Sequence, residues 1–112
     1  SFDALFLTIG KIMEENFASI VYYADAQNIP IIASHAPNVS AGALGALVSN
    51  HFKLGLACAD QAKSILIDKK NPSDIPVGIT TEADILLNAF VAENLEIEIP
   101  SAVLTSATEI FE

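Results

Sequence analysis

The chain has 112 residues, enough for one compact domain, and 52% of them are hydrophobic, so a core can form without disulfides or a structural metal. Acidic residues outnumber basic ones by 14 to 5, and the net charge of −9 argues against proteins that neutralise nucleic-acid phosphates or bind anionic lipid. All 5 basic residues are lysines, so no guanidinium group is present to hold a carboxylate or phosphate through two hydrogen bonds.

Apolar runs and helical periods alternate along the first part of the chain. Residues 5–7 are a continuous apolar run, typical of a strand buried on both faces. Residues 12–28 have helical spacing, with Glu14 and Glu15 on the solvent face, and residues 29–33 are predicted to be the second strand. The apolar residues expected on the buried face of this helix are Met13, Phe17, Ile20, Val21 and Ala24.

The next segment is predicted to be a loop followed by a third strand. Residues 34–40 include Pro37, which favours a loop. Residues 42–48 are rich in small side chains and predict a strand. Gly42 and Gly45 indicate that another backbone or a ligand approaches this strand closely.

A long helix is predicted to begin after Ser49 or Asn50, either of which can cap it, and to end near Lys69. Its expected buried stripe consists of Leu54, Cys58, Ala62, Ile65 and Leu66. Cys58 is the only cysteine, so it has no internal disulfide partner, and we interpret it as a small core residue.

The last third of the chain predicts shorter elements. Strands are expected at residues 75–79 and 85–87, Asn88 is expected to cap a helix at residues 89–95, and Pro100 begins the last helix. Strands that alternate with helices predict an α/β fold with a mainly parallel sheet covered on both faces.

No group of residues specifies a reaction. His35 and His51 lack zinc-ligand spacing, Ser34 lies in no nucleophile elbow, and no phosphate-binding loop is present. Glu96 and Glu98 alternate with apolar residues and are expected to face water. We therefore predict neither enzyme activity nor a metal or other cofactor.

Several sequence blocks occur in a fixed order along the chain. They are DALFL at residues 3–7, NIPIIAS at 28–34, GAL at 42–44, LG at 54–55, PSDIPV at 72–77 and IP at 99–100. Together they resemble the ABC-transporter substrate-binding family related to tryptophan- and other amino-acid-binding lipoproteins. The resemblance covers the whole chain but only about the last third of a typical member.

The resemblance implies a two-lobed, periplasmic-binding-protein-like three-layer sandwich that closes on a small-molecule solute and delivers it to an ABC permease. Residues 1–112 would be its incomplete C-terminal portion, with residues 42–70 belonging to the opposite lobe. A periplasmic or extracellular, membrane-anchored location follows from the family, with the export signal upstream because the chain does not begin with Met. The isolated chain is expected to form a homodimer that covers apolar surface.

This chain departs from the family at positions near the ligand. A Thr-Asp-Asn-like segment reads Ile9-Gly10-Lys11 here, and the usual Asp-Tyr before the long helix is Asn50-His51. Loss of that acid removes a partner for a ligand's ammonium group, which argues against the amino-acid specificity common in relatives, and Lys11 is expected to reverse the preferred charge of the ligand. The expected solute is an amino acid or a related small molecule. The predicted ligand-binding residues, placed at the C-terminal ends of strands, are Gly10, Lys11, Ser34, His35, Gly42 and Asn50.

Three functions remain open at this point. The leading one is solute capture for import. The second is a ligand-sensing domain of a signalling protein, and the third is a degenerate module that binds no small molecule and serves assembly.

Overall fold

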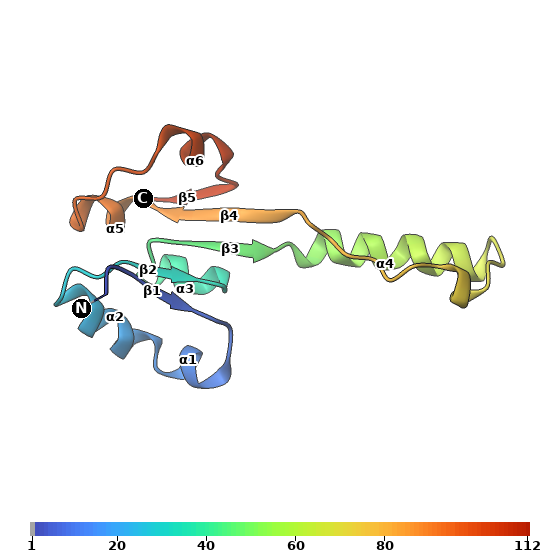
Figure 1. Ribbon diagram of the computed structural model, residues 1–112, viewed down its shortest axis with the longest axis horizontal. Helices are drawn as coiled ribbons and strands as arrows, with labels where there is room; N and C mark the ends of the chain where they lie inside the picture. The colour runs from blue at the N-terminus through green and yellow to red at the C-terminus, as the bar shows by residue number, and fades with distance from the viewer. Residues whose placement is uncertain (1) are drawn as a thin grey trace. The chain divides into compact units, whose positions relative to one another are not determined.

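The computed structural model describes residues 2–112, which form two units. Residues 2–48 and 84–112 make up the first, and residues 49–83 make up the second. The first unit carries a five-stranded sheet in which the strands are neighbours in sequence order (Figure 1). The strands are β1 (Leu5–Leu7), β2 (Ile31–Ala33), β3 (Gly45–Ser49), β4 (Ala83–Asn88) and β5 (Glu109–Phe111).

The sheet is mainly parallel. β1 pairs with β2 so that Leu7 lies opposite Ala33, β2 pairs with β3, and β4 pairs with β5, each pair in parallel. β3 and β4 are neighbours that run in opposite directions (Figure 1). The predicted α/β fold with a mainly parallel sheet is confirmed.

The helix predicted at residues 12–28 is interrupted. α1 (Lys11–Glu15) ends and α2 (Phe17–Asp25) begins around Asn16. The Asn16 side-chain amide donates to the Ile12 carbonyl oxygen at 2.8 Å and competes with the helical backbone bond. The predicted apolar face is largely correct, because Phe17 and Ala24 are buried and Ile20 and Val21 pack against the core, while Met13 is exposed.

The loop predicted at residues 34–40 is wrong, because this segment contains α3 (Ala36–Ser40). Pro37 lies in the first turn of α3, where a missing backbone N–H costs little. Val39 is fully buried, and it holds this short helix against the sheet. Proline was therefore a helix-start signal here rather than a loop signal.

One face of β1 to β3 forms the core. Ile31 and Ala33 of β2 are 2% and 1% exposed and pack in one cluster with residues of α2 and α3. Both helices lie on this face because right-handed connections between strands that follow in the same direction place them there. On the other face, Phe6 of β1 and Leu47 of β3 are 67% and 62% exposed, so in the described residues this part of the sheet lacks the second covering layer that the sequence predicted.

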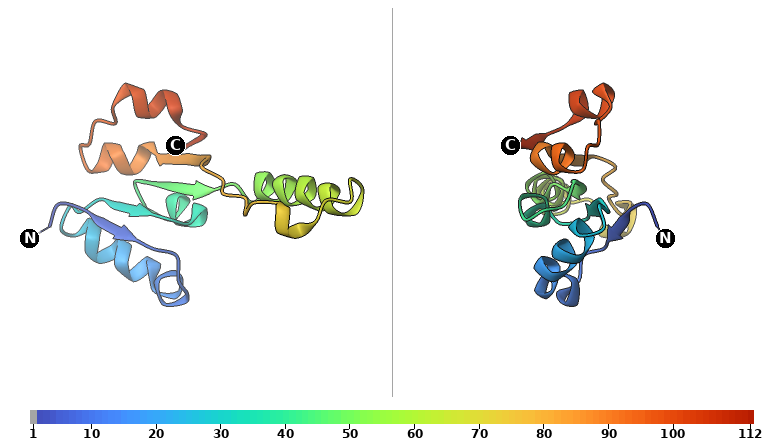
Figure 2. Two further views of the ribbon diagram at one scale, coloured as in Figure 1. Left: turned by 45° about the vertical axis from the view of Figure 1, so that its right-hand side comes forward. Right: turned by 90° about the vertical axis from the view of Figure 1, so that its left-hand side faces the viewer.

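The later strands differ from prediction. Residues 75–79 form no strand, and Val77 and Ile79 are highly exposed, since within the described residues no neighbouring strand pairs with them. β4 forms where residues 85–87 were predicted, and β5 was not predicted at all. α5 (Ala89–Asn94) and α6 (Ser101–Ser106) connect these two strands (Figures 1 and 2).

The second unit begins at residue 49, and residues 42–48 belong to the first unit. The assignment of residues 42–70 to an opposite lobe stays a prediction. It consists of α4 (His51–Leu66), a 3₁₀ turn (Pro72–Asp74) and an extended segment. Asn50 caps α4 as predicted, because its side-chain oxygen accepts a hydrogen bond from the Lys53 N–H at 3.1 Å.

The predicted buried stripe of α4 is wrong. No α4 residue is buried, and Cys58 is exposed rather than part of a core. Within this unit α4 contacts only a thin extended segment, with Gln61 donating to the Pro76 carbonyl oxygen at 3.3 Å and a cavity of about 130 Å³ between Leu54 and Ile79. A helix buries an apolar stripe only where another layer of the structure packs against it, and the extended segment of this unit covers little of α4. Among residues 2–112, no helix is long and apolar enough to cross a bilayer.

Asn88 joins three elements of the first unit. Its buried side chain donates to the Val39 carbonyl oxygen at 2.8 Å and accepts from the Val91 N–H at 3.0 Å. Its backbone N–H donates to the Leu44 carbonyl oxygen at 2.9 Å. The predicted cap of α5 is confirmed, and the same side chain also ties β4 to the end of α3.

We expect Asn88→Ala to lower the free energy of unfolding by about 2–3 kcal/mol, because it removes a helix cap and a buried hydrogen bond to the Val39 carbonyl oxygen, which keeps only its weaker bond from the Gly42 N–H. Asn94→Ala, at an exposed position in the same helix, should change it by less than about 0.5 kcal/mol. Urea denaturation followed by circular dichroism measures both. Equal effects of the two substitutions would show that Asn88 has no special role.

Gly45 is predicted to tolerate no side chain. A Cβ there would lie 2.9 Å from the Leu86 carbonyl oxygen and 3.2 Å from Leu87 Cδ2. Gly45→Ala should therefore destabilise the fold by about 1–3 kcal/mol in the same assay. Gly10→Ala is the control, since its backbone is extended and nothing lies within 4 Å of its added Cβ. An unchanged midpoint for Gly45→Ala would contradict the close approach of β4.

Candidate ligand-binding site

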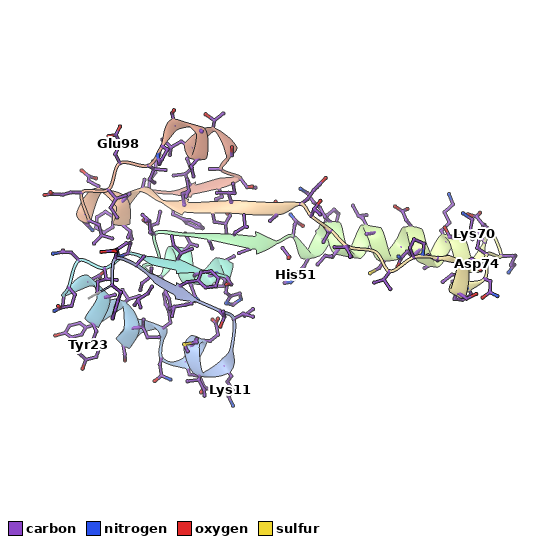
Figure 3. The ribbon with its side chains drawn as sticks, viewed as in Figure 1. Lys11, Tyr23, His51, Lys70, Asp74 and Glu98 are labelled. Atoms are coloured by element: carbon purple, nitrogen blue, oxygen red, sulfur yellow. The ribbon has the colours of Figure 1, made fainter. Side chains whose placement is uncertain are left out.

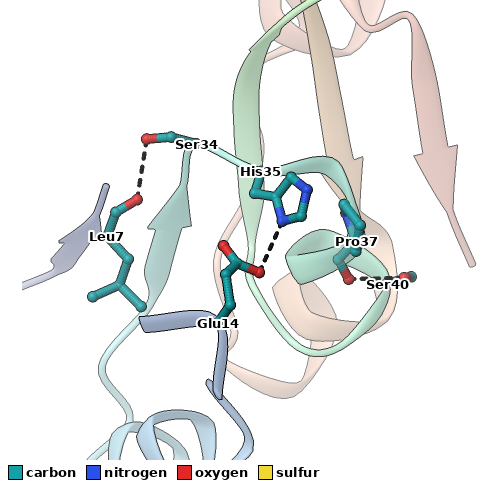
Figure 4. Close-up of polar contacts among 6 residues, drawn as sticks. All are labelled: Leu7, Glu14, Ser34, His35, Pro37 and Ser40. Atoms are coloured by element: carbon teal, nitrogen blue, oxygen red, sulfur yellow. Dashed lines mark hydrogen bonds and ion pairs between the residues drawn. The ribbon is translucent and has the colours of Figure 1, made fainter. Parts of the chain in front are cut away.

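The carboxyl ends of β1 and β2 lie side by side because the two strands are parallel and in register. The chain leaves β1 at Leu7 and enters α1 at Lys11, while it leaves β2 at Ala33 and continues through Ser34 and His35 into α3. The Ser34 hydroxyl donates to the Leu7 carbonyl oxygen at 3.0 Å, which joins the two strand ends (Figure 4). This edge is where open parallel sheets bind ligands.

His35 contacts a residue that the sequence did not predict as part of a site. Its Nδ1 lies 2.8 Å from Glu14 Oε2, across the gap between α1 and the β2–α3 turn (Figure 4). Glu14 was placed on the solvent face of a helix, but its side chain is 30% exposed and turns to His35 instead. The available signal was an acid in the first turn after β1 and a histidine directly after β2, which meet at the same sheet edge.

Lys11 lies at the start of α1 and is highly exposed (Figure 3). Its ammonium group is 3.7 Å from the Glu15 carboxylate, with the two side chains 85% and 62% exposed. An exposed pair of this kind contributes little to stability, so the Lys11 ammonium group can turn to another anion at small cost. Gly10 immediately precedes Lys11, and its carbonyl oxygen accepts the Glu14 N–H at 3.0 Å.

Gly42 is not where the sequence placed it. It follows α3 and precedes β3, so it lies at the amino end of the parallel strands, opposite the edge that holds Ser34 and His35. Its φ of 125° favours glycine, and an added Cβ would come within 2.8 Å of Val21 Cγ1. Backbone conformation and this contact explain the glycine. Gly42 lines a different cavity, of about 490 Å³, together with residues of α2 and α5.

Asn50 belongs to the second unit, where it caps α4. Four of the six predicted residues thus lie on the segments that leave the carboxyl ends of β1 and β2. They are Gly10, Lys11, Ser34 and His35.

The described residues of this edge form neither a catalytic pair nor a metal site. The Ser34 hydroxyl donates to a backbone carbonyl rather than to His35, so the two do not form a nucleophile and base. In the part of the chain that the structure describes, no three metal-ligating side chains gather into a cation site. The titratable side chains of α1 and the β2–α3 turn include an imidazole (His35), a carboxylate (Glu14) and an ammonium group (Lys11).

Comparison with known proteins gives a consistent result. Residues 1–111 match the family described as ABC transporter substrate binding protein. A tyrosine-binding protein of Clostridioides difficile (strain R20291) is 30% identical over 100 residues, which are 89% of this chain and 29% of that protein.

Two solved structures are similar in fold and sequence. One is the ABC domain in complex with L-Trp from Streptococcus pneumonia, with a TM-score of 0.76, 26% identity, and coverage of 99% of this chain and 37% of the other. The second is the ligand-free, open structure of a substrate-binding protein with adhesive properties from Clostridium difficile, with a TM-score of 0.83, 26% identity, and coverage of 98% and 36%.

The chain thus spans little more than a third of these proteins at most. The family match extends over nearly all of its residues, and the sheet has the same fold as the solved relatives. The chain belongs to the ABC transporter substrate-binding protein family.

Proposed function

We propose that this chain forms part of an extracytoplasmic solute-binding protein that captures an amino acid and delivers it to an ABC importer. The observation that carries the proposal is the position of Ser34 and His35 where the parallel strands β1 and β2 end, in a member of this family. The named ligands of two relatives, tyrosine and L-Trp, support an amino acid as the solute.

The edge of β1 and β2 would form one wall of the cleft between two lobes. Lys11 is the group suited to a ligand carboxylate, because its partner Glu15 is exposed and holds it weakly. The Ser34 and His35 side chains supply hydrogen bonds beside it. Closure of the opposite lobe would remove water and strengthen these contacts.

Residues 49–83 would belong to the opposite lobe. α4 buries no residue within its own unit, and Phe52, Leu56 and Leu66 are 75%, 54% and 68% exposed. Apolar residues of this size need a covering layer. The occupant we propose is the remainder of the same protein, because the relatives are about three times as long as the part that this chain matches.

Amino acids should stabilise the full-length protein. At a free ligand concentration of about 100 times Kd, a ligand that binds only the folded state adds about 2.7 kcal/mol, which raises the melting temperature. We expect L-tyrosine or L-tryptophan to give such a shift in differential scanning fluorimetry.

Lys11→Gln should reduce the affinity for that amino acid about tenfold, the loss expected for one charge-assisted hydrogen bond. Lys70→Gln, which removes the same charge from an exposed position in the second unit (Figure 3), should leave it unchanged. If none of the natural amino acids shifts the melting temperature, amino-acid capture is rejected.

A further inference from the structure

The contact between Glu14 and His35 fixes where the imidazole carries its proton. An ionised carboxylate only accepts hydrogen bonds, so the Nδ1 atom, 2.8 Å from Glu14 Oε2, must donate. In the neutral ring the other nitrogen, Nε2, then carries a lone pair. Nε2 points away from Glu14 (Figure 4), and among residues 2–112 it has no hydrogen-bond partner.

The pair of Glu14 and His35 also carries the negative charge of the Glu14 carboxylate, and few neighbouring groups donate hydrogen bonds to it. The second carboxylate oxygen of Glu14, Oε1, is buried and has no hydrogen-bond partner within the described chain. The nearby lysine, Lys11, is directed to Glu15. The carboxylate therefore acts mainly through the His35 ring, and it makes Nε2 a stronger acceptor, as a carboxylate does for a metal-bound histidine.

A lone pair backed by a carboxylate favours a cationic hydrogen-bond donor. A metal ion would need further ligands, and no such group exists in the described residues. The cationic donor that fits a single imidazole nitrogen is an ammonium group. The ligand proposed above, an amino acid, carries such a group.

Building on the proposed function, we propose that His35 Nε2 accepts a hydrogen bond from the α-ammonium group of the bound amino acid and that Glu14 is the positioning residue that holds His35 for this contact. The pair selects ligands that carry an ammonium group. Acids of the same shape that lack this group leave Nε2 unpaired in a closed cleft and bind more weakly.

The positioning role is tested by the tautomer of His35. Long-range ¹⁵N–¹H NMR of the full-length protein under mildly alkaline conditions should show a protonated Nδ1 and an unprotonated Nε2. Glu14→Gln keeps the shape of the side chain but replaces the carboxylate by an amide, which also donates, so the preference should weaken. A ring protonated at Nε2 in the wild-type protein would overturn the proposal.

The selectivity is tested by titration calorimetry with L-tyrosine, L-tryptophan and the analogue of each that lacks the amino group. We expect the wild-type protein to bind the amino acid at least about tenfold more tightly than its analogue. Glu14→Gln and His35→Gln should each reduce this preference to about twofold or less. Glu98→Gln, the same change at an exposed carboxylate (Figure 3), should retain it.

The outcomes separate this proposal from the proposed function. If the wild-type protein binds an amino acid and Glu14→Gln preserves the full preference, the role of the pair is overturned and amino-acid capture stands. If neither L-tyrosine nor L-tryptophan nor any other natural amino acid binds, both fall together. Thermal melts of each variant, expected to match the wild type within a few degrees, show that lost selectivity does not reflect unfolding.

Discussion

The first unit depends on one buried amide. Asn88 ends β4, caps α5, and donates across the core to the Val39 carbonyl oxygen at the end of α3. A side chain with both a donor and an acceptor can satisfy a helix cap and a carbonyl at once, which an ionised aspartate, an acceptor only, cannot do. The Asn88 backbone N–H also donates to the Leu44 carbonyl oxygen, next to the antiparallel pair of β3 and β4. In this pair the backbone of β4 approaches Gly45 closely.

The same sheet that organises the core also explains why so much apolar surface stays open. The connections from β1 to β2 and from β2 to β3 lie on one face, so Ile31 and Ala33 are buried while Phe6 and Leu47 are not. α4 also leaves apolar side chains exposed, and none of its residues is buried. In a family whose solved members are much longer than this chain, these surfaces are suited to contacts with the rest of the protein.

The candidate site arises from register rather than from any local motif. Leu7 and Ala33 are paired, so the residues that follow each strand meet although more than 20 positions separate them, as the Ser34 to Leu7 bond with its separation of 27 illustrates. The positions of Ser34, His35, Gly10 and Lys11 after β1 and β2 were predictable because these residues follow apolar runs, while their role in binding stays a prediction. The contact of Glu14 was missed, because helical periodicity places this residue on a polar face, and only the pairing of β1 with β2 indicates that it meets His35. Gly42 was misplaced because the strand after it begins three residues later than its small residues suggested.

The sequence by itself determined the α/β class, the order of its main strands and helices, and the caps at Asn50 and Asn88, because apolar periodicity and capping are local properties that each segment carries. It also determined the family, through blocks spread along the whole chain. The tertiary structure decided the break at Asn16, the short helix at residues 36–40, the pairing of β5, the exposure of Cys58 and the contact of Glu14 with His35. Except for the break at Asn16, where a local bond to the Ile12 carbonyl oxygen competes with the helix, each of these depends on whether a segment distant in the sequence supplies a partner, and the neighbouring residues do not determine the energy of such a contact.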